Sequence, residues 1–458
     1  MENKNYNTSL FLFRRDLRLV DNTALNEALR LSDRVIAGFV FDDRQIQKHP
    51  YQSQPALQFM LQSLVDLKQQ FNQIGAELTV FQGLPTDVIK TLVAEYNIEA
   101  VFVNRDYTPF SQKRDLEIET LCESKNIDFY CLADSLLTEP EQSLKKEGSP
   151  YKVFTAFYNN ARLFPVAEPQ KVFNNHFLTV DSTVRLCELL ERYKQPDILI
   201  QGGRISALTQ LNDLTDYKDY ADTRDFPALK KTSQLSAHLK FGTVSVREVF
   251  HAIKTQLGQE HPLLRQLYWR DFLTHIAFHF PHVFGHAFIS KFDNITWDNN
   301  RDYFDAWAAG KTGFPIVDAG MRELNTTGFM HNRVRMIVAS FLVKDLRISW
   351  RWGERYFAQH LVDYDPCLNN GNWQWAASTG CDAQPYFRIF NPWLQQKKFD
   401  EQCEYIYRWI PELRAVPANI IHQWDKKYYG CFYPKPIINH SAEVEITKQR
   451  FKIADYIF

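Results

Sequence analysis

Short apolar runs alternate with amphipathic stretches through about the first 130 residues, and this order restricts the fold more than any other feature of the chain. The apolar runs have the length and composition of strands, and the stretches between them repeat with helical periodicity. The strand-like runs are 9–13, 35–41, 78–81, 100–103 and 129–132, and the helical stretches lie near 55–74, 85–96 and 111–125. Repeated strand and helix units predict a parallel sheet covered on both faces. We therefore expect an α/β domain over residues 1–132.

A Rossmann-like parallel sheet of this kind binds ligands beyond the carboxyl ends of its strands. Its usual dinucleotide fingerprint, Gly-x-Gly-x-x-Gly after the first strand, is missing here. The segment at that place is Arg14-Arg15-Asp16-Leu17-Arg18. The first strand therefore carries no sequence signal for a dinucleotide.

The rest of the chain changes character twice. Prolines interrupt regular structure between residues 133 and 200, which is typical of an interdomain linker; they include Pro140, Pro150, Pro165 and Pro169. Beyond about residue 201 the strand-like alternation fades, and helical windows follow one another to the end. The sequence predicts an all-α C-terminal domain over 201–458.

Composition limits the classes of function. The formal net charge of −1 excludes a broad cationic surface and leaves room only for a local basic groove. The seven cysteines lack Cys-x-x-Cys or Cys/His spacing, so they indicate reduced thiols and no metal site. The N-terminus has no apolar signal core, and no apolar run is long enough to cross a bilayer. We expect a cytoplasmic protein without a membrane partner.

One predicted helix, over 263–280, gathers chemically distinct side chains on one face. Gln266, Trp269 and Arg270 are spaced at i, i+3 and i+4, so they lie side by side on a helix. That face offers an amide, an indole plane and a cation together.

A second predicted helix, around 331–342, repeats this spacing with Asn332, Arg335 and Met336. If Arg335 is buried, it needs a carboxylate partner, because an unpaired buried charge is costly. Asp363 is the candidate in the sequence that follows.

The segment from Asn369 to Gly380 places Trp373 and Trp375 among amides and small residues. Two indoles so close together suit a planar aromatic ligand, and the small residues let the ligand approach the backbone. Carboxylates precede the segment, and Arg388 follows it. We interpret it as part of a cofactor site.

Longer motifs carry a resemblance to a known family. They are Phe13-Arg-Arg-Asp-Leu-Arg18 with Asp21-Asn22, Thr232-Ser-Gln-Leu-Ser236, Trp269-Arg-Asp-Phe272, Gly310-Lys-Thr-Gly-Phe-Pro-Ile-Val-Asp318, Met330-His-Asn-Arg-Val-Arg-Met336 and Asn372-Trp-Gln-Trp-Ala-Ala-Ser-Thr-Gly380. In this order, over nearly the whole chain, they resemble the photolyase/cryptochrome family, closest to class I cyclobutane pyrimidine dimer photolyases. The resemblance implies an N-terminal α/β antenna domain and a helical domain that holds a U-shaped FAD.

The same resemblance implies the residues that contact FAD. Those similar to the segment around the pyrophosphate are Tyr220, Thr232, Ser233, Leu235 and Ser236. Those similar to the remaining flavin contacts are Arg270, Asn332, Arg335, Asp363 and Asp365. Asn369 matches the residue beside the flavin nitrogen that gains a proton. Plant cryptochromes have Asp at that position, so Asn369 favours repair over signalling.

The substrate site follows in the same way. Trp269 and Trp375 resemble the two tryptophans that line the dimer pocket, and Met336 resembles the methionine under the lesion. Gln266 stands at the position of a family residue that hydrogen-bonds the thymine pair. Cations in or near the matched motifs are expected at a rim that contacts DNA phosphates: Arg224, Arg333, Arg388, Lys397 and Lys398.

Three more positions match the family's electron relay from the flavin to the surface: Trp373, Trp350 and Trp297. In the family, excited reduced FAD donates an electron to the dimer, the cyclobutane ring splits, and the electron returns. The cofactor carries this chemistry, and the protein supplies position and electrostatics. A dimer in duplex DNA is poorly stacked, so its extrusion into a pocket costs less than that of intact bases. We expect a monomer that acts on UV-damaged DNA.

Gln266 leaves the lesion class open. Cyclobutane dimer photolyases usually have Glu there, whereas Gln is common in 6-4 photolyases and animal cryptochromes. Against the 6-4 alternative, this chain has Asn332 and Met336 where those enzymes have two histidines. A cryptochrome-like photoreceptor is the alternative outside enzymes, and such proteins usually carry a C-terminal extension beyond the point where this sequence stops, at Phe458.

A second, antenna chromophore also stays open. Phe110 and Ser111 occupy positions where folate-binding members of the family have Asn and Glu. Methenyltetrahydrofolate is therefore not assumed. A deazaflavin, a second flavin or no antenna at all fit the sequence.

Overall fold

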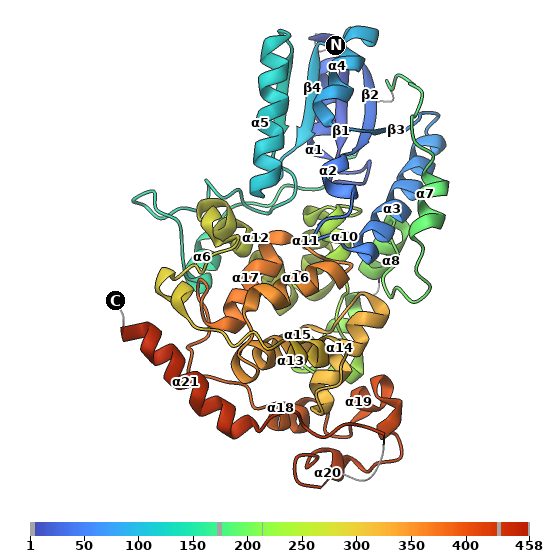
Figure 1. Cartoon of the computed structure of the whole chain (residues 1–458). Helices are drawn as coiled ribbons and strands as arrows, with labels where there is room; N and C mark the ends of the chain where they lie inside the picture. Colours follow the sequence, from blue (N-terminus) through green and yellow to red (C-terminus); the bar gives the residue numbers. More distant parts are fainter. Residues whose placement is uncertain (1–4, 172–175, 213, 428–431, 457–458) are drawn as a thin grey trace.

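The computed structural model describes residues 5–171, 176–212, 214–427 and 432–456. Figure 1 shows an α/β part, β1 to β5 with their helices, standing above a larger helical part that runs from α8 to α21. The fold class predicted from the sequence is confirmed. In the described ranges, no helix has the length and apolar character needed to span a membrane.

The α/β part is built on five parallel strands, in the order β3-β2-β1-β4-β5. They are β1 (Tyr6–Phe13), β2 (Ser32–Phe41), β3 (Thr79–Gln82), β4 (Ala100–Asn104) and β5 (Asp128–Leu132). Each of the five expected runs forms one of these strands. In the register, Leu10 lies opposite Ile36 on one side and Val101 on the other.

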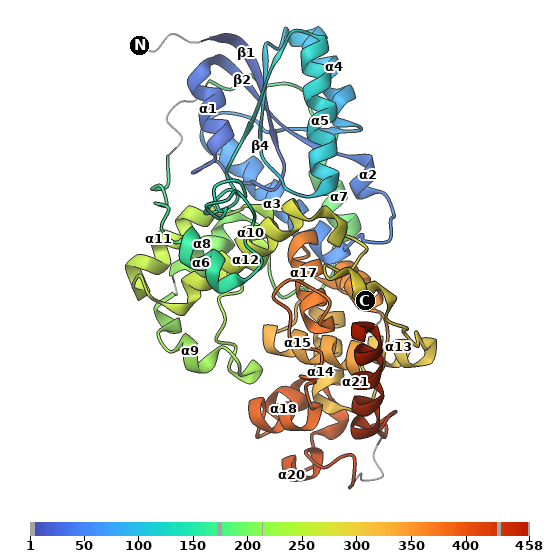
Figure 2. The same cartoon turned by 90° about the vertical axis from the view of Figure 1, so that its left-hand side faces the viewer.

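Helices cover both faces of this sheet because alternate side chains of β1 point to opposite faces. Phe11 and Phe13 pack with α1 (Thr23–Leu31) and α3 (Gln54–Gln73) in one apolar core. Leu10 and Leu12 pack with α4 (Pro85–Tyr96) and α5 (Pro109–Ser124) in another. Figure 2 shows α1 and α5 on opposite sides of β4. The short α2 (Asp43–Ile46) follows β2.

The expected linker, 133–200, contains two helices that the sequence analysis did not identify: α6 (Phe154–Ala161) and α7 (Leu186–Tyr193). α6 packs against α12 of the helical part, and α7 packs against α3 of the α/β part. The segment is therefore built into both halves of the molecule.

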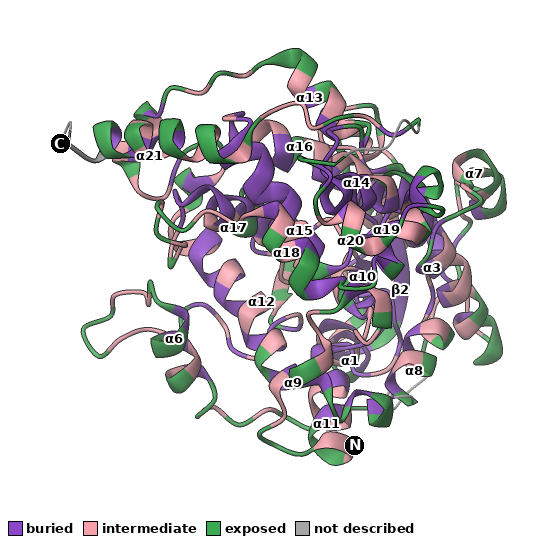
Figure 3. Cartoon of the chain, turned by 90° about the horizontal axis from the view of Figure 1, so that it is seen from below, coloured by how far each residue is buried: buried purple, intermediate pink, exposed green. Residues whose placement is uncertain are grey.

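The helical part follows from residue 204 on. Its helices are α8 (Arg204–Asn212), α9 (Tyr220–Thr223), α10 (Ser236–Phe241), α11 (Val246–Leu257), α12 (Pro262–His279), α13 (Arg301–Ala308), α14 (Pro315–Thr327), α15 (Asn332–Ser340), α16 (Trp350–His360), α17 (Pro366–Ala377), α18 (Pro392–Phe399), α19 (Glu404–Trp409), α20 (Ala418–Ile421) and α21 (His440–Tyr456). A π-helical turn, Phe341–Asp345, continues α15. Figure 3 shows buried residues gathered on α14 to α17 at the centre and exposed ones along α21.

The two parts are packed together closely. α3 contacts both α10 and α16. Gly242 ends α10 with a positive φ of 63°, and a Cβ there would lie 2.2 Å from the carbonyl oxygen of Arg15. This approach requires glycine because any side chain would strike the loop that follows β1.

Candidate active site

Helix α17 lies at the centre of the site and packs against α12, α15 and α16. Pro366 stands in its first turn, and Asp365 caps its N-terminus. Asp365 Oδ1 accepts from the N–H groups of Cys367 (2.9 Å) and Leu368 (3.1 Å), and Oδ2 accepts from the Arg15 guanidinium. Both carboxylate oxygens are thus used within the protein to hold the helix in place.

The predicted partnership of Arg335 and Asp363 is present. Arg335 Nη1 lies 3.2 Å from Asp363 Oδ1, and Nη2 lies 3.0 Å from Oδ2, so the pair is bidentate. Arg335 Nε also donates to the Met330 carbonyl at 2.7 Å. Asp363 is nearly buried, with 5% of its side chain exposed, whereas Arg335 keeps 24%. The exposed fraction leaves part of the guanidinium open to a ligand.

Asn369 projects from α17 toward α16. Its Nδ2 donates to the backbone carbonyl of Glu354 at 2.9 Å. Within the residues described, no donor reaches its Oδ1, so this oxygen is left as an acceptor. Burial raises the pKa of the neighbouring Glu354 carboxyl to about 7, and Asn370 Nδ2 contacts it at 3.3 Å.

Helix α12 forms as expected and places Gln266, Trp269 and Arg270 on one face. Trp269 stacks on Phe154 of α6 with ring centroids 3.6 Å apart at 9°. Gln266 makes a long contact of 3.5 Å to the Pro262 carbonyl, so its amide is scarcely engaged. Arg270 donates to two backbone carbonyls, those of Ser135 and Leu239.

The segment expected at a pyrophosphate lies between α9 and α10. Tyr220 and Leu235 are buried, Thr232 and Ser233 are half-buried, and Ser236 is exposed. α9 contacts α12, so Tyr220 lies beside the helix that carries Gln266. The half-buried hydroxyls suit phosphate oxygens.

The remaining pocket residues lie on the same helices. Met336 and Trp375 are half-buried on α15 and α17. Asn332 is exposed at the start of α15. Its Nδ2 lies 3.8 Å from Met336 Sδ, because residues at i and i+4 are neighbours on a helix.

The three tryptophans of the expected relay differ in burial. Trp373 and Trp350 are 2% and 1% exposed, and Trp297 is half-buried. Trp373 lies so close to α16 that a Cβ on Gly353 would be 2.1 Å from its ring. Trp297 contacts Phe451 of α21 edge to face at 6.3 Å.

The cations expected at a DNA-contacting rim are spread over several segments. Arg388, Lys397 and Lys398 are exposed. Arg224 is half-buried, with its guanidinium 5.8 Å from the Tyr220 ring. Arg333 is paired with Asp225 at 2.9 Å, so its charge is partly neutralised within the protein.

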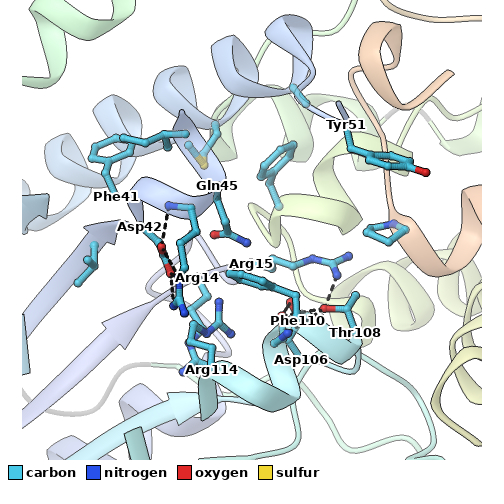
Figure 4. Close-up of a pocket in the computed structure, with 18 of the residues that line it drawn as sticks. Arg14, Arg15, Phe41, Asp42, Gln45, Tyr51, Asp106, Thr108, Phe110 and Arg114 are labelled. Atoms are coloured by element: carbon cyan, nitrogen blue, oxygen red, sulfur yellow. Dashed lines mark hydrogen bonds and ion pairs between the residues drawn. The ribbon is translucent and has the colours of Figure 1, made fainter. Parts of the chain in front are cut away.

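A cavity of about 560 Å³ opens beyond the carboxyl ends of β1 and β2, where a parallel sheet is expected to bind a ligand. Phe110 and Ser111, the two positions that differ from folate-binding relatives, both line it. Figure 4 shows Arg14, Arg15 and Arg114 around this space.

All three of these cavity cations have close acidic neighbours, and Arg114 pairs with Asp115 at 3.1 Å. Arg14 pairs with Asp115 at 2.8 Å, and Arg15 pairs with Asp106 at 3.2 Å. On the helical side, Lys240 also lines the cavity, and burial lowers its pKa to about 8. The lining therefore combines cations with aromatic rings, and the Arg44 guanidinium lies 5.1 Å from the Phe110 ring centroid.

Sequence reasoning missed three residues that the structure places beside the predicted ones: Phe154, Arg15 and Glu354. Phe154 lies in the expected linker, and nothing local to it indicates a partner in α12. Arg15 enters the sequence analysis only through the motif that contains it. The one sequence signal for Glu354 is that this carboxylate lies between Trp352 and Phe357 in a segment rich in aromatic residues. That signal is too weak to predict that the Glu354 side chain is buried.

The donor set fits FAD on structural grounds. The Arg335 guanidinium is partly exposed and offers a cation, and Oδ1 of Asn369 offers an acceptor. The half-buried hydroxyls of Thr232 and Ser233 offer donors to phosphate oxygens. No group of three His, Cys, Asp or Glu side chains among the described residues is arranged to hold a metal ion.

Comparisons with known proteins give matches over nearly the whole chain. Residues 263–453 match the family model for the FAD binding domain of DNA photolyase, and residues 9–171 match the family model for DNA photolyase. A deoxyribodipyrimidine photo-lyase of a Synechococcus species is 39% identical over 472 residues, which cover 97% of this chain and 95% of the relative.

Solved structures give the same result. An archaeal photolyase from Sulfolobus tokodaii, crystallised with two FAD molecules, is 46% identical with a TM-score of 0.88, covering 97% of this chain and 100% of its own. A Synechocystis cryptochrome is 28% identical with a TM-score of 0.87, covering 98% and 100%.

Proposed function

This chain belongs to the DNA photolyase family, and we propose that it uses light to split cyclobutane pyrimidine dimers in UV-damaged DNA. The observation that carries the proposal is the convergence on α17. The Arg335–Asp363 pair, the open Oδ1 of Asn369 and the half-exposed Trp375 lie on or beside this one helix.

FAD would be held by residues of four segments. Arg335 offers a cation beside the flavin ring, and Asp363 keeps that cation in place. Asn369 offers a neutral acceptor to a flavin N–H, which suits a reduced ring. Thr232, Ser233 and Ser236 would face the pyrophosphate. When bound and reduced, FAD supplies the electron that light sends to the dimer.

The lesion would lie over α12, α15 and α17. Trp269 and Trp375 offer flat faces for the two pyrimidines, and Met336 offers a soft apolar contact beneath them. Phe154 stacks on Trp269 at 3.6 Å, so the position of that indole is set before DNA arrives. Gln266 brings amide donors for the pyrimidine carbonyls.

The flanking DNA would contact Arg224, Arg333, Arg388, Lys397 and Lys398. A local rim suffices because damage rather than sequence is recognised, and the chain has a net charge of only −1. We include in the proposal that the protein acts as a monomer in the cytoplasm. The relay residues Trp373, Trp350 and Trp297 would reduce the flavin under light before repair starts.

A second chromophore would occupy the cavity beside β1 and β2. Its volume of about 560 Å³ lies within the usual range for sites of small molecules. The Sulfolobus tokodaii relative was crystallised with two FAD molecules, and Phe110 offers an aromatic face here. We assign a flavin to this cavity. Two flavins per chain in denatured, freshly purified protein would support the assignment, and one per chain would contradict it.

The 6-4 photoproduct and a purely signalling role are the competing assignments, the first because of Gln266. Both are tested by one experiment. Reduced protein is illuminated with oligonucleotides that carry either lesion, and restored thymines are counted by chromatography. We expect the cyclobutane dimer to be repaired and the 6-4 photoproduct to persist. Repair of the 6-4 photoproduct alone, or of neither lesion, would overturn the proposal.

A further inference from the structure

Arg265 lies on the face of α12 that carries the expected lesion pocket, and the proposed function gives it no role. It stands four residues before Trp269, and side chains at i and i+4 are neighbours on a helix. Gln266 follows it directly, and Arg265 itself is exposed. A guanidinium is therefore present within about one helical turn of the indole on which a pyrimidine would lie.

Two aromatic rings of α6 hold this guanidinium in place. The Arg265 Cζ lies 5.1 Å from the ring centroid of Phe154 and 5.1 Å from that of Tyr158. Figure 2 shows α6 beside α12, and the two helices are packed together. Phe154 also stacks on Trp269, with ring centroids 3.6 Å apart. The cation and the indole thus share one aromatic support, which fixes their relative position before DNA arrives.

The N–H groups of Arg265 are not engaged by other parts of the protein. Among the residues that the structure describes, none accepts a hydrogen bond from this guanidinium or forms an ion pair with it. Arg162, which lies 5.4 Å from the other neighbour of Arg265, Tyr158, is instead paired with Glu260 at 2.8 Å. Arg265 therefore keeps its full charge and its N–H donors for a partner from outside.

The partner that fits Arg265 is a phosphate. A planar fork of N–H donors matches two oxygens of a phosphate group, and a DNA strand brings one such group with every nucleotide. The pyrimidines would lie on Trp269, so the backbone that carries them passes beside Arg265. An intact duplex does not bring its backbone to this place, because pairing and stacking keep its bases inside the helix.

We propose that Arg265 binds a phosphate of the damaged strand, at the two extruded nucleotides, and so helps the protein to distinguish damaged from undamaged DNA. The inference rests on the proposed function, since it requires a dimer that lies on Trp269. It differs from the phosphate rim, whose contacts to flanking DNA are made with or without a lesion. The Arg265 contact forms only when the dimer has left the stack.

The test measures binding in the dark, by the protein with its FAD, of a duplex with one cyclobutane thymine dimer and of the same duplex without it. Arg265→Gln should weaken binding of the dimer duplex about eightfold at 0.1 M salt and about twofold at 0.5 M, because one lost phosphate contact reduces the salt slope by about 0.9. Binding of the undamaged duplex should not change. Arg265→Lys keeps the charge and should retain the salt slope of wild type.

Arg301→Gln is the matched control. Arg301, on α13, is also an exposed arginine over an aromatic ring, with its Cζ 5.5 Å from the Phe304 centroid. It is paired with Asp305 at 3.0 Å, so it lacks the free donors of Arg265. This change should alter the affinity for neither duplex.

A second measurement locates the phosphate. Methylphosphonate, which has no charge, replaces in turn the phosphate between the two thymines of the dimer and the phosphates on either side. At one of the three positions it should weaken binding by wild type about as much as Arg265→Gln does, and it should weaken binding by Arg265→Gln no further. Additive losses at all three positions would overturn the inference.

Two other results would also overturn it. Arg265→Gln could weaken both duplexes equally, which would make Arg265 part of the general rim. It could instead lower the repair of bound dimers per absorbed photon without a change in salt slope, as expected if Arg265 only supports Phe154. If wild type itself shows no preference for the dimer duplex, the proposed function fails. A wild-type preference that Arg265→Gln retains in full contradicts only the phosphate contact.

Discussion

Arg15, in the loop after β1, donates a hydrogen bond to Asp365, the N-cap of α17. This contact links two positions that are 350 residues apart in the chain. The two side chains are only 22% and 7% exposed. Arg15 also pairs with Asp106 at 3.2 Å, which ties it to the α/β part. Through these contacts, the helix that carries Asn369 and Trp373 is anchored to the sheet.

Arg15→Ala should lower the free energy of unfolding by about 3 kcal/mol, because it leaves Asp365 buried without its main cation. This loss is at the low end of the range for a broken buried ion pair, because the positive charge of Lys240 still stabilises the Asp365 carboxylate. Urea unfolding measures it. The matched control is Arg30→Ala, whose partner Glu27 and own side chain are 30% and 50% exposed. That change should cost less than about 1 kcal/mol, and equal losses in the two variants would contradict the anchoring role.

Asp363→Ala should release FAD. The change leaves Arg335 without its bidentate partner, which costs roughly 3–5 kcal/mol when such a pair is buried. Flavin absorbance per chain after gel filtration measures the loss. Asp363→Asn is the control, since it keeps the shape and one acceptor and should retain more flavin than Asp363→Ala. Full flavin content in Asp363→Ala would show that this ion pair does not support the cofactor.

Gln266→Leu should reduce dimer repair severalfold to tens of fold without releasing FAD. A neutral hydrogen bond contributes roughly 0.5–1.5 kcal/mol, and more is lost when the partner carries charge. Gln266→Glu should keep much of the activity and add a pH dependence, because its donor exists only when the carboxyl is protonated. Repair is counted per absorbed photon. Equal yields for wild type and Gln266→Leu would remove this side chain from the lesion pocket.

Glu354 should make the stability of the protein depend on pH. Burial raises the pKa of this carboxyl to about 7 in the folded chain, well above its value in an unfolded chain. Between the two values the folded state binds the extra proton, so the free energy of unfolding falls as pH rises toward about 7. The stabilising contribution of protonated Glu354 is fully present below the pKa that this carboxyl has in the unfolded chain. It is lost as pH rises through the higher pKa in the folded chain.

Glu354→Gln removes this titration while it keeps the shape of the side chain. Urea unfolding of both proteins at pH 5.5, 7 and 8.5 should show a steeper loss in wild type, by about 1–3 kcal/mol over the range. All other titrating groups are shared, so they cancel in the comparison. Identical slopes would mean that Glu354 is ionised throughout.

The sheet was predictable because its signals are local. Each strand of a parallel sheet covered on both faces is a short apolar run, and five such runs became β1 to β5. α1 was missed because it ends at Leu31 and β2 begins at Ser32, so no turn separates the two apolar stretches. α6 was missed because a proline-rich segment surrounds a helix of only 8 residues.

The sequence also predicted which candidate site residues share a helix face, because their spacing along the helix decides this. Gln266, Trp269 and Arg270 came together for that reason, as did Asn332 and Met336. Arg335 was expected to need a carboxylate partner if buried, and Asp363 was the candidate. The structure shows a bidentate ion pair between these two side chains.

Contacts between distant segments were decided only by the tertiary structure. Nothing near Phe154 in the chain predicts that it stacks on Trp269, and nothing near Arg15 predicts Asp365. The ring contact of Trp307 with Trp373 likewise depends on how α13 meets α17. The sequence determined the elements and their faces by short-range periodicity. Which faces meet depends on packing the whole core at once, and local patterns do not record that.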